Sequence, residues 1–288
     1  MTLGQAETRT NHEQKERKPV DKRALIADLK ERIAGGEPGN AGLPGAISLG
    51  TGINEALPDG GLRKGALHEI AASAYRDMGA ATGFLAALAV CAMKDSSRPV
   101  LWCEAWRPPF DMGRLHGPGI AAFGLDPARL LLAAPPGDSD CLWVMEEALR
   151  SRAFAFVAGE VDGRSSALSL AATRRLQLAA EETQTPVLLF TGHAKGSASV
   201  AVTRWHVAGA ESRNILYADE MERLPGCPRW DISLARCRGG QPGRWRVEWN
   251  AQERVLSRVS PVKEGETKPA PAKARAAGDD IVFLRQTA

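Results

Sequence analysis

Short continuous apolar runs alternate along the middle of the chain with longer segments whose apolar residues recur at helical spacing. The apolar runs predict strands at residues 66–71, 99–103, 130–134, 153–158 and 185–190. The periodic segments between them predict helices at residues 79–94, 114–123, 141–152 and 167–182. Continuous apolar strands alternating with helices indicate a mostly parallel sheet that is sandwiched by helices, and therefore the α/β fold class.

The last third of the chain has a different pattern. Residues 230–236 and 244–249 alternate between apolar and polar with period two, and the glycine-rich stretch 239–243 separates them. Trp245, Val247 and Trp249 fall on one face of the second segment. Arg244 and Arg246 share the other face with Glu248. This pattern predicts a C-terminal antiparallel hairpin at the edge of the sheet with its tryptophans buried.

Both ends of the chain are polar, and this composition divides the chain into three predicted regions: an arm at 1–45, a core at 46–258 and a tail at 259–288. The arm is expected to be disordered except for an amphipathic helix at about 21–34, whose apolar stripe consists of Leu25, Ile26, Leu29 and Ile33. The tail is also expected to be disordered and ends in a short apolar motif, Ile281, Val282, Phe283 and Leu284. Each apolar segment can dock on the core of this chain or on a partner protein, and the sequence leaves both open.

Composition narrows the class of protein. The chain has 37 Lys and Arg against 34 Asp and Glu, so its net charge of +3 creates no strong field toward nucleic acid or membrane. Its five cysteines are scattered and form no CxxC pair, and no histidine spacing suggests a metal site. The apolar run at 78–93 is shorter than the ~20 residues that span a bilayer. We therefore expect a cytoplasmic protein without a metal and without membrane binding.

An ordered series of motifs in residues 47–249 resembles the RecA recombinase superfamily. Residues 51–70 carry a Thr-Gly, Leu, Gly-Gly-Leu-x-x-Gly pattern before the first strand, and residues 124–132 carry a Gly-Leu-Asp-x-x-x-Leu-Leu-Leu passage. The strand at 154–160 matches the Walker B strand in position, and the strand at 187–193 matches the one that ends in a sensor glutamine. The resemblance implies a RecA-like sheet with a nucleotide site at the start of the first long helix.

The nucleotide-binding residues of that superfamily are missing here. Gly79, Ala80 and Thr82 stand where the resemblance places Gly-Lys-Thr, so the phosphate-binding lysine is absent. Gly159 replaces the Walker B carboxylate, and Glu160 beside it is expected to point away from the site. His193 replaces the sensor glutamine. The resemblance therefore implies a pseudo-ATPase with no catalytic residue and no cofactor, while an ATPase with an atypical phosphate site is an alternative.

A RecA-like chain without that lysine and with a charged tail resembles the ImuA family. The resemblance implies a non-catalytic adaptor in the SOS response to DNA damage, where translesion synthesis causes mutagenesis. Its implied partners are an ImuB-like relative of Y-family polymerases, an error-prone polymerase III alpha-type subunit and RecA, and it implies association with the nucleoid after damage. A SulA-like cell-division inhibitor is the alternative.

Direct contact with DNA is a separate hypothesis. Arg238, Arg244 and Arg246 are interleaved with Trp245 and Trp249, and arginine beside aromatic residues is typical of nucleic-acid surfaces. A solvated or protein-binding edge is the other interpretation. His68 lies inside a predicted strand and is expected to be a hydrogen-bonded core histidine.

Overall fold

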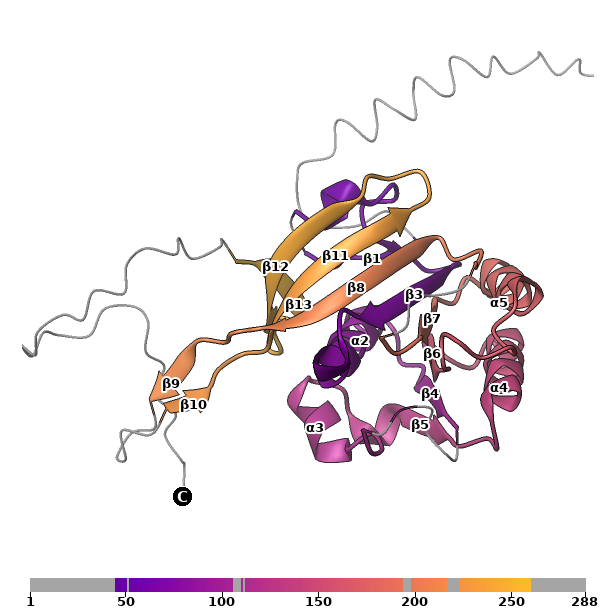
Figure 1. The fold of residues 1–288 in the computed structure, drawn as a ribbon, viewed down its shortest axis with the longest axis horizontal. Coiled ribbons are helices and arrows are strands. Elements are labelled where there is room, and N and C mark those ends of the chain that lie inside the picture. Colours follow the sequence, from indigo (N-terminus) through magenta and orange to yellow (C-terminus); the bar gives the residue numbers. More distant parts are fainter. Residues whose placement is uncertain are drawn as a thin grey trace, which may run out of the picture. The chain divides into compact units, whose positions relative to one another are not determined.

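A computed structural model describes residues 45–50, 52–105, 110, 112–193, 198–216 and 223–259 (Figure 1). The predicted apolar stripe at Leu25, Ile26, Leu29 and Ile33 lies outside the described residues. So does the apolar motif at Ile281, Val282, Phe283 and Leu284. The predictions for the arm and the tail therefore stay predictions.

A nine-stranded sheet forms the centre of the described fold, with strand order β13-β12-β11-β8-β3-β7-β6-β4-β5 (Figure 1). Six strands are parallel: β3 (Leu67–Ala72), β4 (Val100–Glu104), β5 (Leu130–Ala133), β6 (Phe156–Glu160), β7 (Val187–Phe190) and β8 (Thr203–Ala210). Three strands extend the sheet antiparallel: β11 (Arg229–Cys237), β12 (Gly243–Asn250) and β13 (Val255–Arg258). Two small pairs accompany the sheet: β1 (Ala46–Ile47) with β2 (Leu62–Arg63), and β9 (Asn214–Leu216) with β10 (Arg223–Pro225). The expected α/β class is confirmed.

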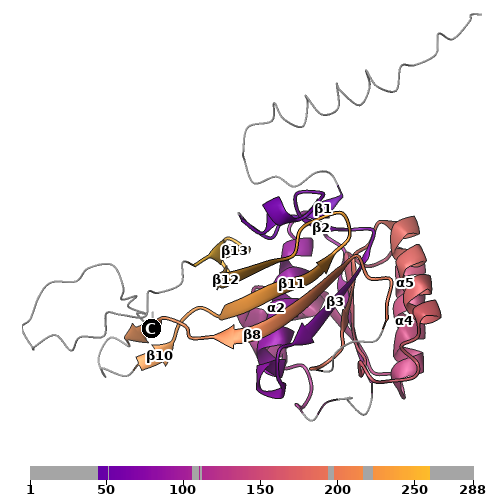
Figure 2. The ribbon, with the colours of Figure 1, turned by 45° about the horizontal axis from the view of Figure 1, so that its top comes forward.

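Helices cover the two faces of the parallel strands. The apolar helix α2 (Met78–Ala92) and the short α3 (Gly117–Ala122) pack on one face, where they share a core with residues such as Trp102 and Phe190. On the other face, α4 (Asp138–Ser151) and α5 (Leu170–Thr183) lie side by side over a second core (Figure 2). Each helix returns the chain to the start of the next parallel strand, as crossover connections require.

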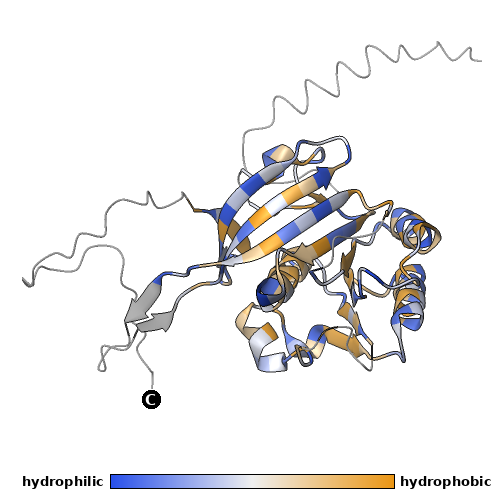
Figure 3. Ribbon diagram, in the orientation of Figure 1, coloured by the Kyte–Doolittle hydropathy of each residue, from blue (hydrophilic) through white to orange (hydrophobic). Residues whose placement is uncertain are grey.

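The antiparallel strands alternate in burial as the sequence predicted. Trp230, Ile232, Val247 and Trp249 are buried on the α2 side, and Trp245 packs against the same core while partly exposed. Polar and apolar residues therefore alternate along β8, β11 and β12 (Figure 3).

Two expectations about the sheet are wrong. The predicted hairpin is β11–β12, but it is not the sheet edge, because β13 pairs with β12 and occupies that position. Strand β5 is not covered on both faces, because it is the opposite edge strand and its Leu131 and Leu132 are half exposed. A run of leucines suggested burial on both faces, but the flanking helices do not extend over this last strand.

Candidate functional site

The crevice at the carboxyl ends of the parallel strands is the place where open α/β sheets bind ligands. Strand β3 leads there through a 3-10 turn at Tyr75–Asp77 into the N-terminus of α2. A phosphate at such a position needs free backbone N–H groups. Here the N–H of Asp77 donates to the carbonyl of Ala74 at 3.0 Å, and the N–H of Met78 donates to that of Tyr75. The turn thus uses donors that a phosphate would need.

A carboxylate also stands at the start of α2. Asp77 is buried, and its Oδ1 accepts a hydrogen bond from the N–H of Gly209 on β8 at 3.1 Å. A negative side chain at a helix N-terminus is stabilised by the helix dipole, and it repels a second anion at the same place.

The three residues predicted as the degenerate phosphate site lie in the first turns of α2. Gly79 is exposed and next to open space, whereas Ala80 packs toward Gly209 on β8. Thr82 Oγ1 donates to the carbonyl of Met78 at 3.3 Å, so its hydroxyl is used within the helix. The side chains of these residues offer neither a cation nor a free hydroxyl to the crevice.

Gly159 and Glu160 end strand β6 and face opposite sides of the sheet. A Cβ on Gly159 would lie 2.2 Å from Sδ of Met145 on α4, so this position faces the α4 side. Glu160 faces the α2 side, where the indole N–H of Trp102 donates to its Oε1 at 3.0 Å. The expectation that Glu160 points away from the crevice is therefore wrong, since its carboxyl lies on the side from which α2 starts.

A second carboxyl lies beside Glu160. Glu104 ends the neighbouring strand β4 in direct register with Glu160, and it forms an ion pair with Arg114 at 3.4 Å. The pKa of Glu160 is raised to about 7, chiefly by burial; the hydrogen bond from Trp102 lowers it, and the nearby charge of Glu104 adds to the rise. Glu104, Trp102 and Arg114 were not among the site residues that the sequence predicts. Glu104 at the end of an apolar run was the available signal for this pair.

His193 lies just beyond β7, at the carboxyl end of the parallel strands where the sequence placed it. Its exposed ring meets Tyr75 edge to face, with ring centroids 5.6 Å apart. His193 and Tyr75 thus connect the turn before α2 to the end of β7.

The prediction for His68 is confirmed. Its Nε2 donates to the carbonyl of Arg63 at 2.8 Å, so Nδ1 is the acceptor for the hydroxyl of Thr203 at 2.7 Å. The indole N–H of Trp205 donates to the same Thr203 oxygen. Burial lowers the pKa of His68 to about 4, which keeps the ring neutral.

The three arginines predicted to bind DNA differ in whether they form ion pairs or hydrogen bonds within the protein. Arg246 forms a two-pronged ion pair with Asp231 across β12 and β11, at 2.7 and 2.8 Å, and Arg238 donates to the carbonyl of Val200. Arg244 is exposed and lines a groove of about 670 Å³ together with His206. Contact with DNA stays a prediction, and Arg244 is the one of the three that forms neither an ion pair nor a hydrogen bond within the described residues.

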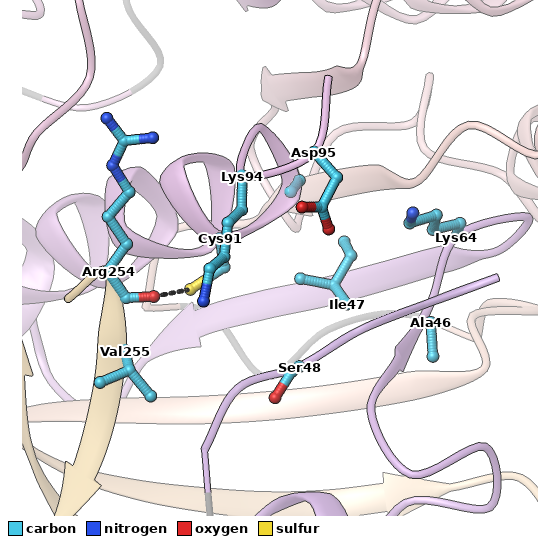
Figure 4. Close-up of a pocket in the computed structure, with 10 residues that line it drawn as sticks. Ala46, Ile47, Ser48, Lys64, Cys91, Lys94, Asp95, Arg254 and Val255 are labelled. Carbon is cyan, nitrogen blue, oxygen red and sulfur yellow. Dashed lines mark hydrogen bonds between the residues drawn. The ribbon is translucent and has the colours of Figure 1, made fainter. Parts of the chain in front are cut away.

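A smaller pocket of about 440 Å³ lies at the other end of α2 (Figure 4). Lys64, Lys94 and Asp95 line it, and the Cys91 thiol faces the carbonyl of Arg254 at 3.6 Å. The guanidinium of Arg254 turns away from the pocket in Figure 4. Burial raises the pKa of the Cys91 thiol to about 12, which favours the protonated thiol near neutral pH.

The part of the chain that the structure describes contains neither a metal-binding cluster nor a membrane-spanning helix. No three His, Cys, Asp or Glu side chains gather there in a way that could hold a metal ion. No helix in the same ranges is both long enough and apolar enough to cross a membrane.

The geometry defines the class of protein: an α/β domain in which buried carboxyl groups lie at the carboxyl ends of the parallel strands and the turn before α2 uses its own N–H groups. No protein-family model matches the chain. Over 213 residues it is 32% identical to protein ImuA of Caulobacter vibrioides, in strain NA1000 / CB15N and in a second strain, and the match covers 70% of this chain and 81% of the relative. The chain belongs to the ImuA family.

Proposed function

We propose that this protein is a non-catalytic adaptor of an error-prone translesion synthesis complex. It joins an ImuB-like relative of Y-family polymerases to an error-prone polymerase III alpha-type subunit, with RecA as a further partner, in the cytoplasm and at the nucleoid after DNA damage. Membership of the ImuA family supports a role in damage-induced mutagenesis. The observation that carries the non-catalytic part is the start of α2, where Asp77 and the 3-10 turn take the place of a phosphate cradle.

The adaptor is a pseudo-ATPase under this proposal. Phosphoryl transfer needs a cation on the transferred group and a carboxylate that organises Mg²⁺. Ala80 offers no cation, and the Glu160 carboxyl has a pKa of about 7, so it is only partly ionised near neutral pH. These residues therefore supply neither the cation for the transferred phosphoryl group nor a fully ionised carboxylate for Mg²⁺.

ATP binding therefore tests the non-catalytic part. We expect the full chain to bind Mg·ATP with a Kd above about 1 mM, which corresponds to less than about 4 kcal/mol of binding free energy. We expect Ala80→Lys alone to leave the Kd for Mg·ATP unchanged. The Asp77 carboxylate remains at the start of α2, and the N–H groups of Asp77 and Met78 still donate to backbone carbonyls within the turn. Isothermal titration calorimetry of the natural chain and of the Ala80→Lys variant measures the Kd for Mg·ATP. Saturable binding by the natural chain with a Kd below about 1 mM would instead support an ATPase with an atypical site.

The partner-binding elements are proposed to lie at the two ends of the chain. The stripe of Leu25, Ile26, Leu29 and Ile33 suits a groove on a partner, and the motif of Ile281, Val282, Phe283 and Leu284 suits strand addition or a shallow pocket. Two separate elements on polar segments would let one chain hold two proteins at once.

Capture of partners tests these elements. We expect the full chain to co-purify with the ImuB-like protein, and we expect Leu29→Asp or Phe283→Asp to reduce capture of at least one partner by tenfold or more (about 1.4 kcal/mol). Ala27→Asp and Gln286→Asp are matched controls, because they add the same charge outside the two apolar sets. Equal capture by all variants would move the interface to the core. Capture of neither polymerase-type partner by the natural chain would overturn the adaptor proposal.

A further inference from the structure

Among the described residues, strand β5 is an apolar edge strand of the sheet with no strand on its outer side. It pairs with β4 alone, and the backbone of residues 131–133 has no hydrogen-bond partner outside β4 among the described residues. Leu131 is 53% exposed and Leu132 is 50% exposed. Leu131 is in register with Leu101 of the α4-side core and Leu132 with Trp102 of the α2-side core, so the two leucines lie on opposite faces.

Proteins normally protect such an edge. Charged side chains, proline, a bulge or a covering segment prevent a free strand from pairing with other chains. The four residues of β5 contain neither charge nor proline. The neighbouring Arg129 does not guard the edge, because its guanidinium donates to the carbonyl of Arg98 at 2.8 Å. An apolar edge strand that is exposed on both faces is therefore well suited to pair with another strand.

We propose that residues 281–284 of this same chain add to the free edge of β5 as a tenth strand. The two segments match in length, with four residues each, and in chemistry, since both are apolar. Alternation along an extended segment would place Ile281 and Phe283 on one face and Val282 and Leu284 on the other. Both exposed leucines of β5 would thus be covered by one short strand.

The length of chain between the core and the motif permits this docking. The sheet has nine strands, so its two edges are about 38 Å apart at about 4.8 Å per strand. Residues 260–280, which are 21 in number, separate the end of the described core from Ile281. Fully extended they reach about 70 Å. A tethered segment binds at an effective concentration of about millimolar, which compensates for the small area of a four-residue strand.

Docking has a regulatory consequence, which rests on the proposed function. A motif that covers β5 is unavailable to a polymerase-type partner, so partner binding and edge protection compete for the same four residues. The free adaptor would be protected against edge-to-edge association, and it would expose β5 only when a partner takes the tail.

Amide hydrogen exchange on the full chain tests the docking without any partner. Val282→Pro removes an N–H donor and disfavours the added strand. We expect it to speed exchange of the outward-facing β5 amides roughly tenfold. Gln286→Pro, a matched change outside the motif, should have no effect, and neither should affect β13 at the other edge. Identical β5 exchange in the natural chain and the Val282→Pro variant would overturn the proposal.

Dilution separates docking within one chain from docking between two copies. We expect protection of β5 to be unchanged over a hundredfold dilution, because the tether fixes the effective concentration. Protection that is lost on dilution would assign the strand to a second copy and overturn docking within the chain. These outcomes do not depend on capture of polymerase-type partners, so failure of the docking and failure of the adaptor proposal can be told apart.

Discussion

Glu160→Gln is expected to raise the free energy of unfolding by about 3 kcal/mol at pH 8. In the folded protein burial raises the pKa of Glu160 to about 7, against 4.5 for an ordinary glutamate. Since each pKa unit corresponds to about 1.4 kcal/mol, ionising this buried carboxyl destabilises the fold by about 3 kcal/mol. Glutamine removes the charge and can still accept the hydrogen bond from Trp102.

The pH dependence of the same variant gives a sharper test. A carboxyl with a raised folded-state pKa destabilises the fold as pH rises from about 4.5, and fully above about 7. His68 acts in the opposite sense, because its lowered pKa destabilises the fold as pH falls from 6.5 to about 4. Between pH 4.5 and 6.5, the change in unfolding free energy with pH that comes from Glu160 is therefore nearly cancelled by the opposite change from His68 in the natural protein. In Glu160→Gln only the histidine effect remains, so we expect about 3 kcal/mol to be lost on acidification across that window.

Urea unfolding at pH 4.5, 6.5 and 8 measures both quantities. The matched control is Glu147→Gln on α4, because Glu147 is half exposed and its ion pair with Arg150 is long, at 3.8 Å. We expect it to change stability by less than about 0.5 kcal/mol at each pH. A Glu160→Gln protein no more stable than the natural one at pH 8 would show that the carboxyl is solvated or paired there.

The order of elements in the core could be predicted from the sequence because each element carries its own signal. The five apolar runs became β3 to β7, and the segment between the second and third became α3. Strand β8 was missed although the buried Trp205 and Val207 alternate with only partly buried neighbours in it. Strand β13 was missed because four residues give too short a pattern to separate from a turn.

The direction of side chains at the crevice could not be predicted. A parallel strand covered on both faces has no alternation between apolar and polar residues, so its sequence does not say which residue faces which helix. The run that leads to Gly159 and Glu160 is of this kind, and only the packing of Met145 and Trp102 fixes the two faces. His68 was predictable for the opposite reason, since a lone polar residue inside an apolar strand must find partners.

Gly159→Asp, which places a carboxylate at the position proposed to match Walker B, is expected to destabilise the fold by about 3 to 5 kcal/mol. The new side chain would start 2.2 Å from Sδ of Met145 and would place a charge in the α4-side core without a partner. Gly159→Ala is the control for volume alone. We expect it to cost about 1 to 2 kcal/mol, because the flexible methionine can shift.

Urea unfolding and Mg²⁺ titration of Gly159→Asp test this placement together. We expect no gain in Mg²⁺ or Mg·ATP binding, because the added carboxylate faces α4 and the crevice lies on the side of α2. A variant as stable as the natural protein that also gains Mg²⁺ binding would mean that residue 159 faces the crevice. That result would support the match of position 159 with the Walker B carboxylate. The expected result would place the side chain of residue 159 in the α4-side core and leave Glu160 as the carboxyl that ends β6 on the α2 side, hydrogen-bonded to Trp102.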